Sequence, residues 1–173
     1  MSEARILTLK AIGRVVRGPS YPPEPGWEAR EALIEVDSDW AEALEGIEGF
    51  SHIWLLWWLD RRDAPPGALL VHPEGRPEVP LVGIFATRSP HRPNPLAMTA
   101  VQLLERQGRR LRVRGLDACQ GTPILDIKPY LLRGDLISEA SMPGWLDRLW
   151  SLHDQERAER GRVNDAQIQD HRQ

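Results

Sequence analysis

Two proline-rich segments carry most of the side chains in this chain that could do chemistry. Residues 85–95 read FATRSPHRPNP and residues 121–130 read GTPILDIKPY. A proline fixes its own φ and pushes the preceding residue towards extended backbone. The loop carrying Arg88, Ser89, Arg92 and Asn94 should therefore be rigid, which lowers the ordering cost of binding a small polar ligand. The alternative is a proline-rich turn with solvated arginines, because turns attract Pro, Ser and Asn in any protein.

In the second segment, Asp126, Lys128 and Tyr130 alternate with apolar residues. Successive side chains of a strand point to opposite faces, so we expect the acid, the amine and the phenol to line one face. The residues of the other parity, expected to face the core, are Leu125, Ile127 and Pro129. Proline cannot donate a ladder hydrogen bond, so this strand should lie at a sheet edge or be about to end. An active-site wall and an ordinary edge strand with a solvated Asp–Lys pair both remain open.

The composition is that of an ordinary globular protein: 173 residues, 41% hydrophobic and 27% charged. No apolar run approaches the length that spans a bilayer, and no secretory signal is visible at the N-terminus, so we expect no membrane partner. The single cysteine, Cys119, excludes an internal disulfide framework and fits a reducing cytosol. A cytoplasmic location is therefore expected.

The charge and the short motifs narrow the classes of function. A net charge of −3 argues against a broad electrostatic footprint on nucleic acid, although it allows a local one. The five histidines show neither HExxH nor Cys–His spacing, so we expect no metal. Without a Walker loop, GxSxG or GxGxxG, nucleotide hydrolysis, serine hydrolysis and a Rossmann methyltransferase lack support.

Short strands separated by turn residues predict an all-β, mainly antiparallel barrel. The expected strands are residues 7–17, 31–37, 52–59, 67–72, 81–86, 98–106, 110–116 and the second segment above. A short helix at 38–44 should follow the second strand, with Trp40 and Leu44 on one side, and an amphipathic helix should begin at Pro143. We expect a barrel domain over 1–140, a C-terminal helix over 141–160 and a flexible polar tail over 161–173.

Residues 52–59, HIWLLWWL, are apolar on both faces of the expected strand. A strand covered on one side only would alternate, so this one needs cover on both. The barrel core covers one face; a helix or a second subunit could cover the other, and we favour a homodimer. The three tryptophans indicate either core packing or an aromatic wall for an adenine or a sulfonium.

Arg110, Arg112 and Arg114 share one face of the strand over 110–116, while Leu111 and Val113 should point inward. The arginines form either a solvated outer face or a phosphate-contacting stripe that could hold an RNA loop. Candidate substrate contacts are therefore Arg112 together with Arg92 and Asn94.

Taken together, the two segments resemble the signature motifs of the TsaA-like, or YaeB-like, family, which includes the tRNA N6-adenosine methyltransferase TrmO. A third stretch, GIEGFSHIW at residues 46–54, is similar to the family motif before its central strand. The resemblance implies a compact β-barrel that binds S-adenosylmethionine and works as a homodimer. It also implies methylation of N6 of a modified adenosine beside the tRNA anticodon.

The resemblance further assigns a cofactor pocket to the end of the Trp-rich strand, the ATRS arginine, a position after RPNP and the GTP turn. In this sequence the residues are Leu59, Asp60, Arg88, Met98, Gly121, Thr122, Pro123 and Ile124. Arg88 can pair with a carboxylate or a ribose oxygen, and Asp60 with the amino group of the methionine moiety. Backbone at Gly121 can approach an adenine closely, because glycine has no side chain.

Methyl transfer from a sulfonium requires the nucleophile, the methyl carbon and the sulfur in line, with water excluded. An N6 attached to an adenine ring and a carbonyl carries an acidified proton, which a carboxylate or phenolate could take. Asp126 is the first candidate for this base, with Lys128 and Tyr130 orienting the substrate and balancing charge.

The sequence departs from the family pattern at three places. The PRQ motif and the basic RPPR motif are absent, and Asp60 stands where a histidine commonly ends the central strand. Two alternatives therefore stay open beside a tRNA methyltransferase: methyl transfer to a small molecule, and a non-catalytic barrel that binds the cofactor or RNA.

Overall fold

The computed structural model describes residues 6–19, 26–61 and 68–170. The chain divides into two compact units. The barrel unit comprises Met1–Gly67 and Pro90–Leu136; the helical unit comprises Ala68–Ser89 and Ile137–Gln173. The inserted segment 68–89 thus groups with the C-terminal helix, whereas the sequence suggested domain boundaries at 140 and 160.

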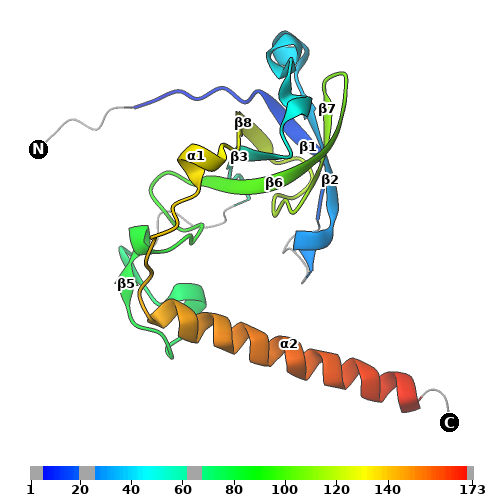
Figure 1. Ribbon diagram of the computed structural model, residues 1–173. Coiled ribbons are helices and arrows are strands. Elements are labelled where there is room, and N and C mark those ends of the chain that lie inside the picture. Colours follow the sequence, from blue (N-terminus) through cyan, green and yellow to red (C-terminus); the bar gives the residue numbers. More distant parts are fainter. Residues whose placement is uncertain (1–5, 20–25, 62–67, 171–173) are drawn as a thin grey trace, which may run out of the picture. The chain divides into compact units, whose positions relative to one another are not determined.

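In the described part of the barrel unit, six antiparallel strands close into a barrel in the order β1-β2-β7-β6-β3-β8 (Figure 1). The strands are β1 Gly13–Arg17, β2 Glu31–Val36, β3 His52–Trp58, β6 Leu96–Gln107, β7 Arg110–Arg114 and β8 Pro123–Pro129. The expected antiparallel barrel is confirmed. Pairing of β8 with β1 closes the sheet, so β8 ends at Pro129 without being an edge strand.

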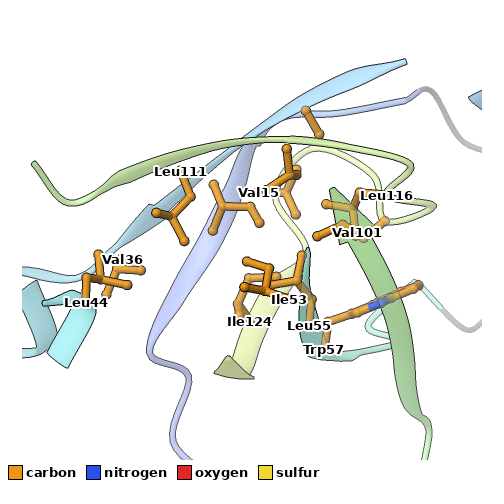
Figure 2. Close-up of a cluster of buried hydrophobic side chains, with 14 residues drawn as sticks. Val15, Val36, Leu44, Ile53, Leu55, Trp57, Val101, Leu111, Leu116 and Ile124 are labelled. Carbon is orange, nitrogen blue, oxygen red and sulfur yellow. The ribbon is translucent and has the colours of Figure 1, made fainter. Parts of the chain in front are cut away.

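The barrel interior is filled by alternate side chains from every strand (Figure 2). Fully buried examples, one from each strand, are Val15, Ile34, Leu55, Val101, Leu111 and Ile124. Burying an aliphatic side chain of this size contributes roughly 1.5–3 kcal/mol. The core therefore fixes the inward parity of each strand, and with it the residues that must face outward.

Several expected elements are shorter or tighter than their sequence suggested. Among the described residues, the strands expected over 67–72 and 81–86 are reduced to Leu70–Val71 and Val82–Gly83. The strand expected over 7–17 begins at Gly13. Two bonds at Ile12 extend its pairing by one residue: the Asp37 N–H donates to the Ile12 carbonyl, and the Ile12 N–H donates to the Ile124 carbonyl. The short helix is a 3₁₀ helix, η2 Ser38–Leu44.

The expectation that Trp40 and Leu44 lie on one side of this helix is wrong. Residues four apart are about 120° apart around a 3₁₀ helix, against about 40° in an α-helix. Leu44 is accordingly buried, whereas Trp40 is exposed and Lys10 lies over its ring, 5.5 Å from the centroid.

The helical unit joins α2 Trp145–Asp170 to the hairpin of β4 Leu70–Val71 and β5 Val82–Gly83. An ion pair and a histidine–carboxylate hydrogen bond tie the 3₁₀ turn η4 Pro73–Gly75 and its neighbour Arg76 to α2. They link Arg76 to Glu156 at 2.7 Å and Glu74 to His153 at 2.7 Å. Helix α2 continues past the expected boundary at 160; flexibility of 161–173 stays a prediction.

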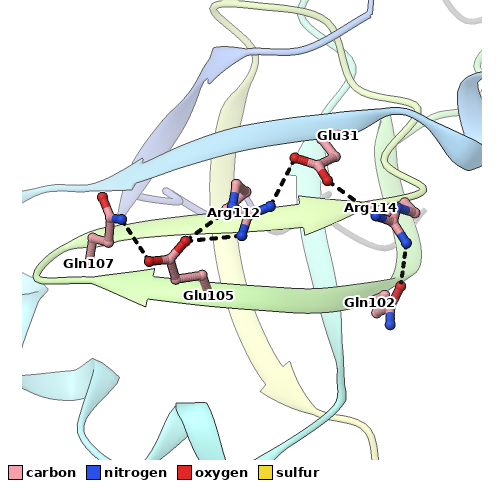
Figure 3. Close-up of polar contacts among 6 residues, drawn as sticks. All are labelled: Glu31, Gln102, Glu105, Gln107, Arg112 and Arg114. Carbon is pink, nitrogen blue, oxygen red and sulfur yellow. Dashed lines mark hydrogen bonds and ion pairs between the residues drawn. The ribbon is translucent and has the colours of Figure 1, made fainter.

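A ladder of ion pairs and hydrogen bonds covers the outer face of β2, β7 and β6 (Figure 3). Arg112 donates to Glu105 at 3.0 Å and to Glu31 at 3.0 Å. Arg114 donates to the other oxygen of Glu31 at 3.1 Å and to Gln102 at 3.3 Å. The arginines therefore do share one outer face, as expected, and carboxylates on both neighbouring strands offset their charge.

This ladder should make the stability of the protein depend on pH. Hydrogen bonds from Arg112 and Arg114 hold the pKa of Glu31 below its ordinary value of 4.5. Those from Gln107 and Arg112 lower the pKa of Glu105 in the same way. A carboxyl group whose pKa is lower in the folded state stabilises the fold above its unfolded-state pKa, and the contribution is lost as the pH falls through the folded-state value.

We therefore predict that the free energy of unfolding, measured by urea denaturation, falls as the pH drops to 4.5 and below. Glu31→Gln should flatten this dependence, because it removes a titrating member of the ladder. Glu42→Gln, at an exposed acid elsewhere, should keep the wild-type profile. Identical profiles for the two variants would contradict the prediction.

Candidate active site

Strand β3 is paired on both sides, with β6 and with β8, and is apolar on both faces. Its inward side chains Ile53, Leu55 and Trp57 are buried in the core. Its outward side chains Trp54, Leu56 and Trp58 are half-buried. The tryptophans thus serve two purposes: one packs in the core, and two give the outer face of the sheet an aromatic character.

The pairing register places the candidate catalytic row on this outer face. Trp54 lies opposite Lys128 of β8, and Leu56 lies opposite Asp126 of β8 and Met98 of β6. Directly opposed residues project from the same face. Asp126, Lys128 and Met98 therefore share one surface, with Met98 and Asp126 separated by two strand spacings, or about 10 Å.

The Asp126 carboxylate has two donors close to it. The Lys128 ammonium lies 2.6 Å from Oδ2, and the Ile127 N–H donates to Oδ1 at 2.9 Å. Both side chains of the ion pair are largely exposed, so water and ligands can reach them. A substrate N–H that gives its proton to Asp126 would have to compete with these donors, so the ion pair would shift when the substrate binds.

Tyr130 completes the row just beyond the end of β8. Its ring is tilted against Trp54, with 5.6 Å between the ring centroids, and lies edge-on to His52 at 6.4 Å. Its backbone N–H donates to the His52 carbonyl at 3.1 Å. The acid, the amine and the phenol therefore share one face, as the alternation predicted, and Lys128 and Tyr130 lie beside Trp54 of β3.

The expectation that Leu125 faces the core is wrong. Leu56 pairs with Asp126 but the next residue, Trp57, pairs with Ile124, so Leu125 is the extra residue of a β-bulge. Ile124 is fully buried and Ile127 packs against the core, whereas Leu125 lies outside the described core cluster. The bulge shifts the parity of β8 by one residue between its two ends.

The end of β3 lies beside the GTP turn, because Trp57 pairs with Ile124. Leu59 packs against the core and Asp60 is exposed. Gly121 adopts a positive φ of 93°. These parts of the expected cofactor pocket are thus brought together.

The turn does not offer all of its side chains to a ligand. Thr122 is 2% exposed and Ile124 is 0% exposed, so either would reach a ligand through its backbone. Gly121 is exposed and Pro123 is half-buried. The assignment of all four turn residues to a cofactor pocket stays a prediction. Of the four, Gly121 and Pro123 are the ones with surface that a ligand could contact directly.

The loop at 85–95 is divided between the two units. Arg88 is exposed in the helical unit, whereas half-buried Arg92 and exposed Asn94 belong to the barrel unit. Local hydrogen bonds stiffen the loop: the Arg92 N–H donates to the Pro90 carbonyl at 2.9 Å, and the Leu96 N–H to the Asn94 carbonyl at 2.7 Å. The structure therefore brings Arg92 and Asn94 into the barrel unit, and the role of Arg88 stays a prediction.

The loop is also joined to the central strand, because the Leu59 N–H donates to the Pro95 carbonyl at 2.9 Å. Arg112, in contrast, lies on β7 in the ion-pair ladder, beyond β6 from this face. A phosphate contact by Arg112 would have to compete with Glu31 and Glu105. Its role as a substrate contact stays a prediction.

Two polar links near the turn were not expected from the sequence. The Thr99 hydroxyl donates to Asp117 at 2.6 Å and accepts from the Trp57 indole at 3.4 Å. The Arg61 guanidinium donates to the Gln120 carbonyl. These partners lie far apart in the sequence, and no motif connects them.

Charged groups gather around the thiol at the same turn. Burial raises the pKa of Cys119; Arg61 opposes this shift, and Asp60 and Asp117 reinforce it. A raised pKa disfavours the thiolate, the nucleophilic form. Cys119 is thus a buried packing residue, as its sequence context favoured, and Arg61, Asp60 and Asp117 lie close enough to act on it.

A comparison with known families identifies the fold and its motifs. Residues 18–136 match the family model described as the tRNA-methyltransferase O N-terminal domain. The chain belongs to this family. The TsaA-like resemblance of the two proline-rich segments is thereby confirmed.

The chain is similar to a probable S-adenosyl-L-methionine-binding protein of Archaeoglobus fulgidus, with 43% identity over 149 residues, 82% of this chain and 38% of that protein. A protein of the same description from Methanothermobacter thermautotrophicus is 41% identical over 135 residues, 75% of this chain and 93% of that protein. A crystal structure of TrmO from Pseudomonas aeruginosa matches with a TM-score of 0.63 and 29% identity, over 82% of this chain and 62% of that one. The chain thus spans well under two thirds of the Archaeoglobus protein.

The described part of the chain has two features that bear on membranes and metals. No helix there is long and apolar enough to cross a bilayer. In the same residues, no group of three or more His, Cys, Asp or Glu side chains is placed to hold a metal ion.

We predict that Gly121→Ala destabilises the fold by about 1–2 kcal/mol, because a positive φ strains any residue with a side chain. A Cβ at Gly121 would also lie 3.5 Å from the Arg61 guanidinium. The matched control is Gly134→Ala in α1 Leu132–Asp135, where a Cβ would meet no described atom within 4 Å. The free energy of unfolding of both variants is measured by urea denaturation. An equal loss of stability in Gly121→Ala and Gly134→Ala would contradict the prediction.

Proposed function

We propose that this protein is an S-adenosylmethionine-dependent methyltransferase that acts on N6 of a modified adenosine next to the tRNA anticodon. One observation carries the proposal: Asp126, Lys128 and Tyr130 share the outer face of the barrel with Trp54 and Met98. The family membership and the descriptions of the relatives support the cofactor and the reaction class. The identity of the RNA substrate is a further and more specific part of the proposal.

The chemistry of the residues near the turn fits this cofactor. S-adenosylmethionine supplies an activated methyl group on a sulfonium and carries an ammonium group. Asp60 is an exposed carboxylate that can pair with a cation, and its charge acts on Cys119 beside the turn. Trp54 and Trp58 offer half-buried aromatic surface, which attracts cations and stacks on adenine.

Asp126 has the role of general base in this scheme. It would accept the N6 proton as the nitrogen gains its methyl group, and Lys128 would balance the charge that moves during the transfer. Tyr130, held against Trp54, would orient the adenine. Arg92 and Asn94, on the loop joined to the end of β3, would contact the nucleotide.

One observation favours methyl transfer to a small molecule as the second candidate. The ladder arginines Arg112 and Arg114 are paired with glutamates, so they offer an RNA loop less free positive charge than the sequence suggested. A small acceptor would need no such stripe. The cytoplasmic location rests on the cysteine content in either case.

Transfer of labelled methyl groups tests the proposal. Wild-type protein incubated with labelled S-adenosylmethionine and total tRNA should place label in RNA. Label in metabolite extracts alone would support the small-molecule acceptor, and binding without any transfer would support a non-catalytic barrel.

We predict that Asp126→Asn lowers turnover about 100-fold or more while cofactor affinity stays unchanged, because a general base contributes at least this much. Glu139→Gln, at an exposed acid outside the row, should keep the wild-type turnover. Undiminished turnover in Asp126→Asn would remove this residue from the role of base.

We also infer that the protein is a homodimer, in which a second copy packs over Leu96 at the Trp58 end of β3 and leaves the Asp126–Lys128 pair open to substrate. Leu96 and Met98 remain 38% and 49% exposed there, beside half-buried Trp58 and Leu56. Burying such apolar area is a common driving force for stable self-association.

Multi-angle light scattering should therefore give the mass of two chains for the wild type. Leu96→Asp should give the mass of one chain, because a charge would be buried at the interface. Met142→Asp, at an exposed apolar residue of the helical unit, should leave the mass unchanged. A monomeric wild type would contradict the inference.

A further inference from the structure

The segment between β7 and β8, residues 115–122, carries the GTP turn and will be called the β7–β8 loop. On one side it is held by β1. The Gly121 N–H donates to the Val15 carbonyl at 2.8 Å, and the Val15 N–H donates to the Thr122 carbonyl at 3.0 Å. These backbone bonds fix the end of the loop on the strand next to β8.

On the other side the loop is held by Arg61, which follows the end of β3. Its Nη2 donates to the Gln120 carbonyl, the group directly before Gly121. The missing Cβ of Gly121 would lie 3.5 Å from the same nitrogen, so the guanidinium lies over the side of Gly121 that has no side chain. The Arg61 charge also acts on the Cys119 thiol, where it opposes the rise in pKa that burial causes, in keeping with its place beside the loop.

The start of the loop has a separate tie. Asp117 accepts from the Thr99 hydroxyl, which accepts from the buried indole of Trp57. This link fixes the loop to β6 and β3 from within the barrel. Arg61 is placed differently, because it is exposed. Since it directly follows Asp60 in the sequence, its bond to the loop also ties the loop to Asp60.

We propose that Arg61 is a positioning residue of the cofactor site. It fastens the β7–β8 loop to the end of β3, and so fixes the separation between Asp60 and Gly121. A loop fixed before the ligand arrives reduces the ordering cost of binding. A guanidinium suits this task because its planar donors form a charge-assisted hydrogen bond with a carbonyl. The inference rests on the proposed function, since it takes these two residues as sides of the S-adenosylmethionine site.

Titration calorimetry with S-adenosylmethionine tests the inference. Arg61→Met keeps the length of the side chain but removes its donors and charge, and should weaken binding roughly tenfold, the factor expected for one charge-assisted hydrogen bond. Arg61→Lys should fall between this variant and the wild type. Arg148→Met, which removes an exposed arginine from the helical unit, should bind as the wild type does.

Kinetics and hydrogen exchange separate positioning from a general loss of structure. The KM for S-adenosylmethionine should rise by the same factor in Arg61→Met while kcat is kept. The amides of residues 119–122 should exchange faster in this variant, with the barrel strands and the melting temperature unchanged.

The two proposals fail in different ways. A wild-type protein that binds no S-adenosylmethionine would overturn the proposed function, and the cofactor role of Arg61 with it. A wild type that binds, together with an Arg61→Met variant of equal affinity or equal amide exchange, would overturn the positioning inference alone.

Discussion

The pairing of β3 with a strand on each side is the constraint on which the rest of the barrel depends. In a strand with a partner on each edge, the backbone hydrogen-bonding groups are occupied. The side chains can then point only to the core face or to the outer face, and they alternate between the two. Ile53, Leu55 and Trp57 must then fill the core, and Trp54 and Leu56 must face outward. Everything placed opposite these two residues follows: Asp126, Lys128 and Met98 share a surface because β3 brings β8 and β6 to its two edges.

The outer surface of the barrel is divided by electrostatics as well as by shape. Over β2, β7 and β6 the arginines and glutamates offset each other in one connected ladder. Over β3 and β8 the surface is aromatic, with a single exposed acid–amine pair. Each exposed ion pair contributes little to stability. Because the arginines of the ladder are paired with glutamates, this face also attracts polyanions only weakly. Ligand recognition is therefore better placed on the aromatic side.

The sequence predicted those features that depend on local alternation. The barrel strands, the inward set on β7 and the shared face of the candidate catalytic row all follow from a period of two, which is visible in the sequence around Leu111 and Asp126. The bulge at Leu125 could not be predicted from the sequence, because the position of an extra residue depends on the pairing with β3 and not on the residues next to Leu125. The link from Arg61 to Gln120 was equally hidden, since only the closed barrel brings residues 59 positions apart into contact.

The helical unit is assembled from two stretches that lie, in the sequence, on either side of the segment carrying β6, β7 and β8. The span shared with the family ends at residue 136, so it contains the hairpin of this unit but not helix α2. The pairs Glu74–His153 and Arg76–Glu156 cross that border. A substitution on one side of the border therefore changes a contact made by the other side. Grafting the 18–136 span onto another protein would carry over half of a unit and leave its ion-pairing partners behind.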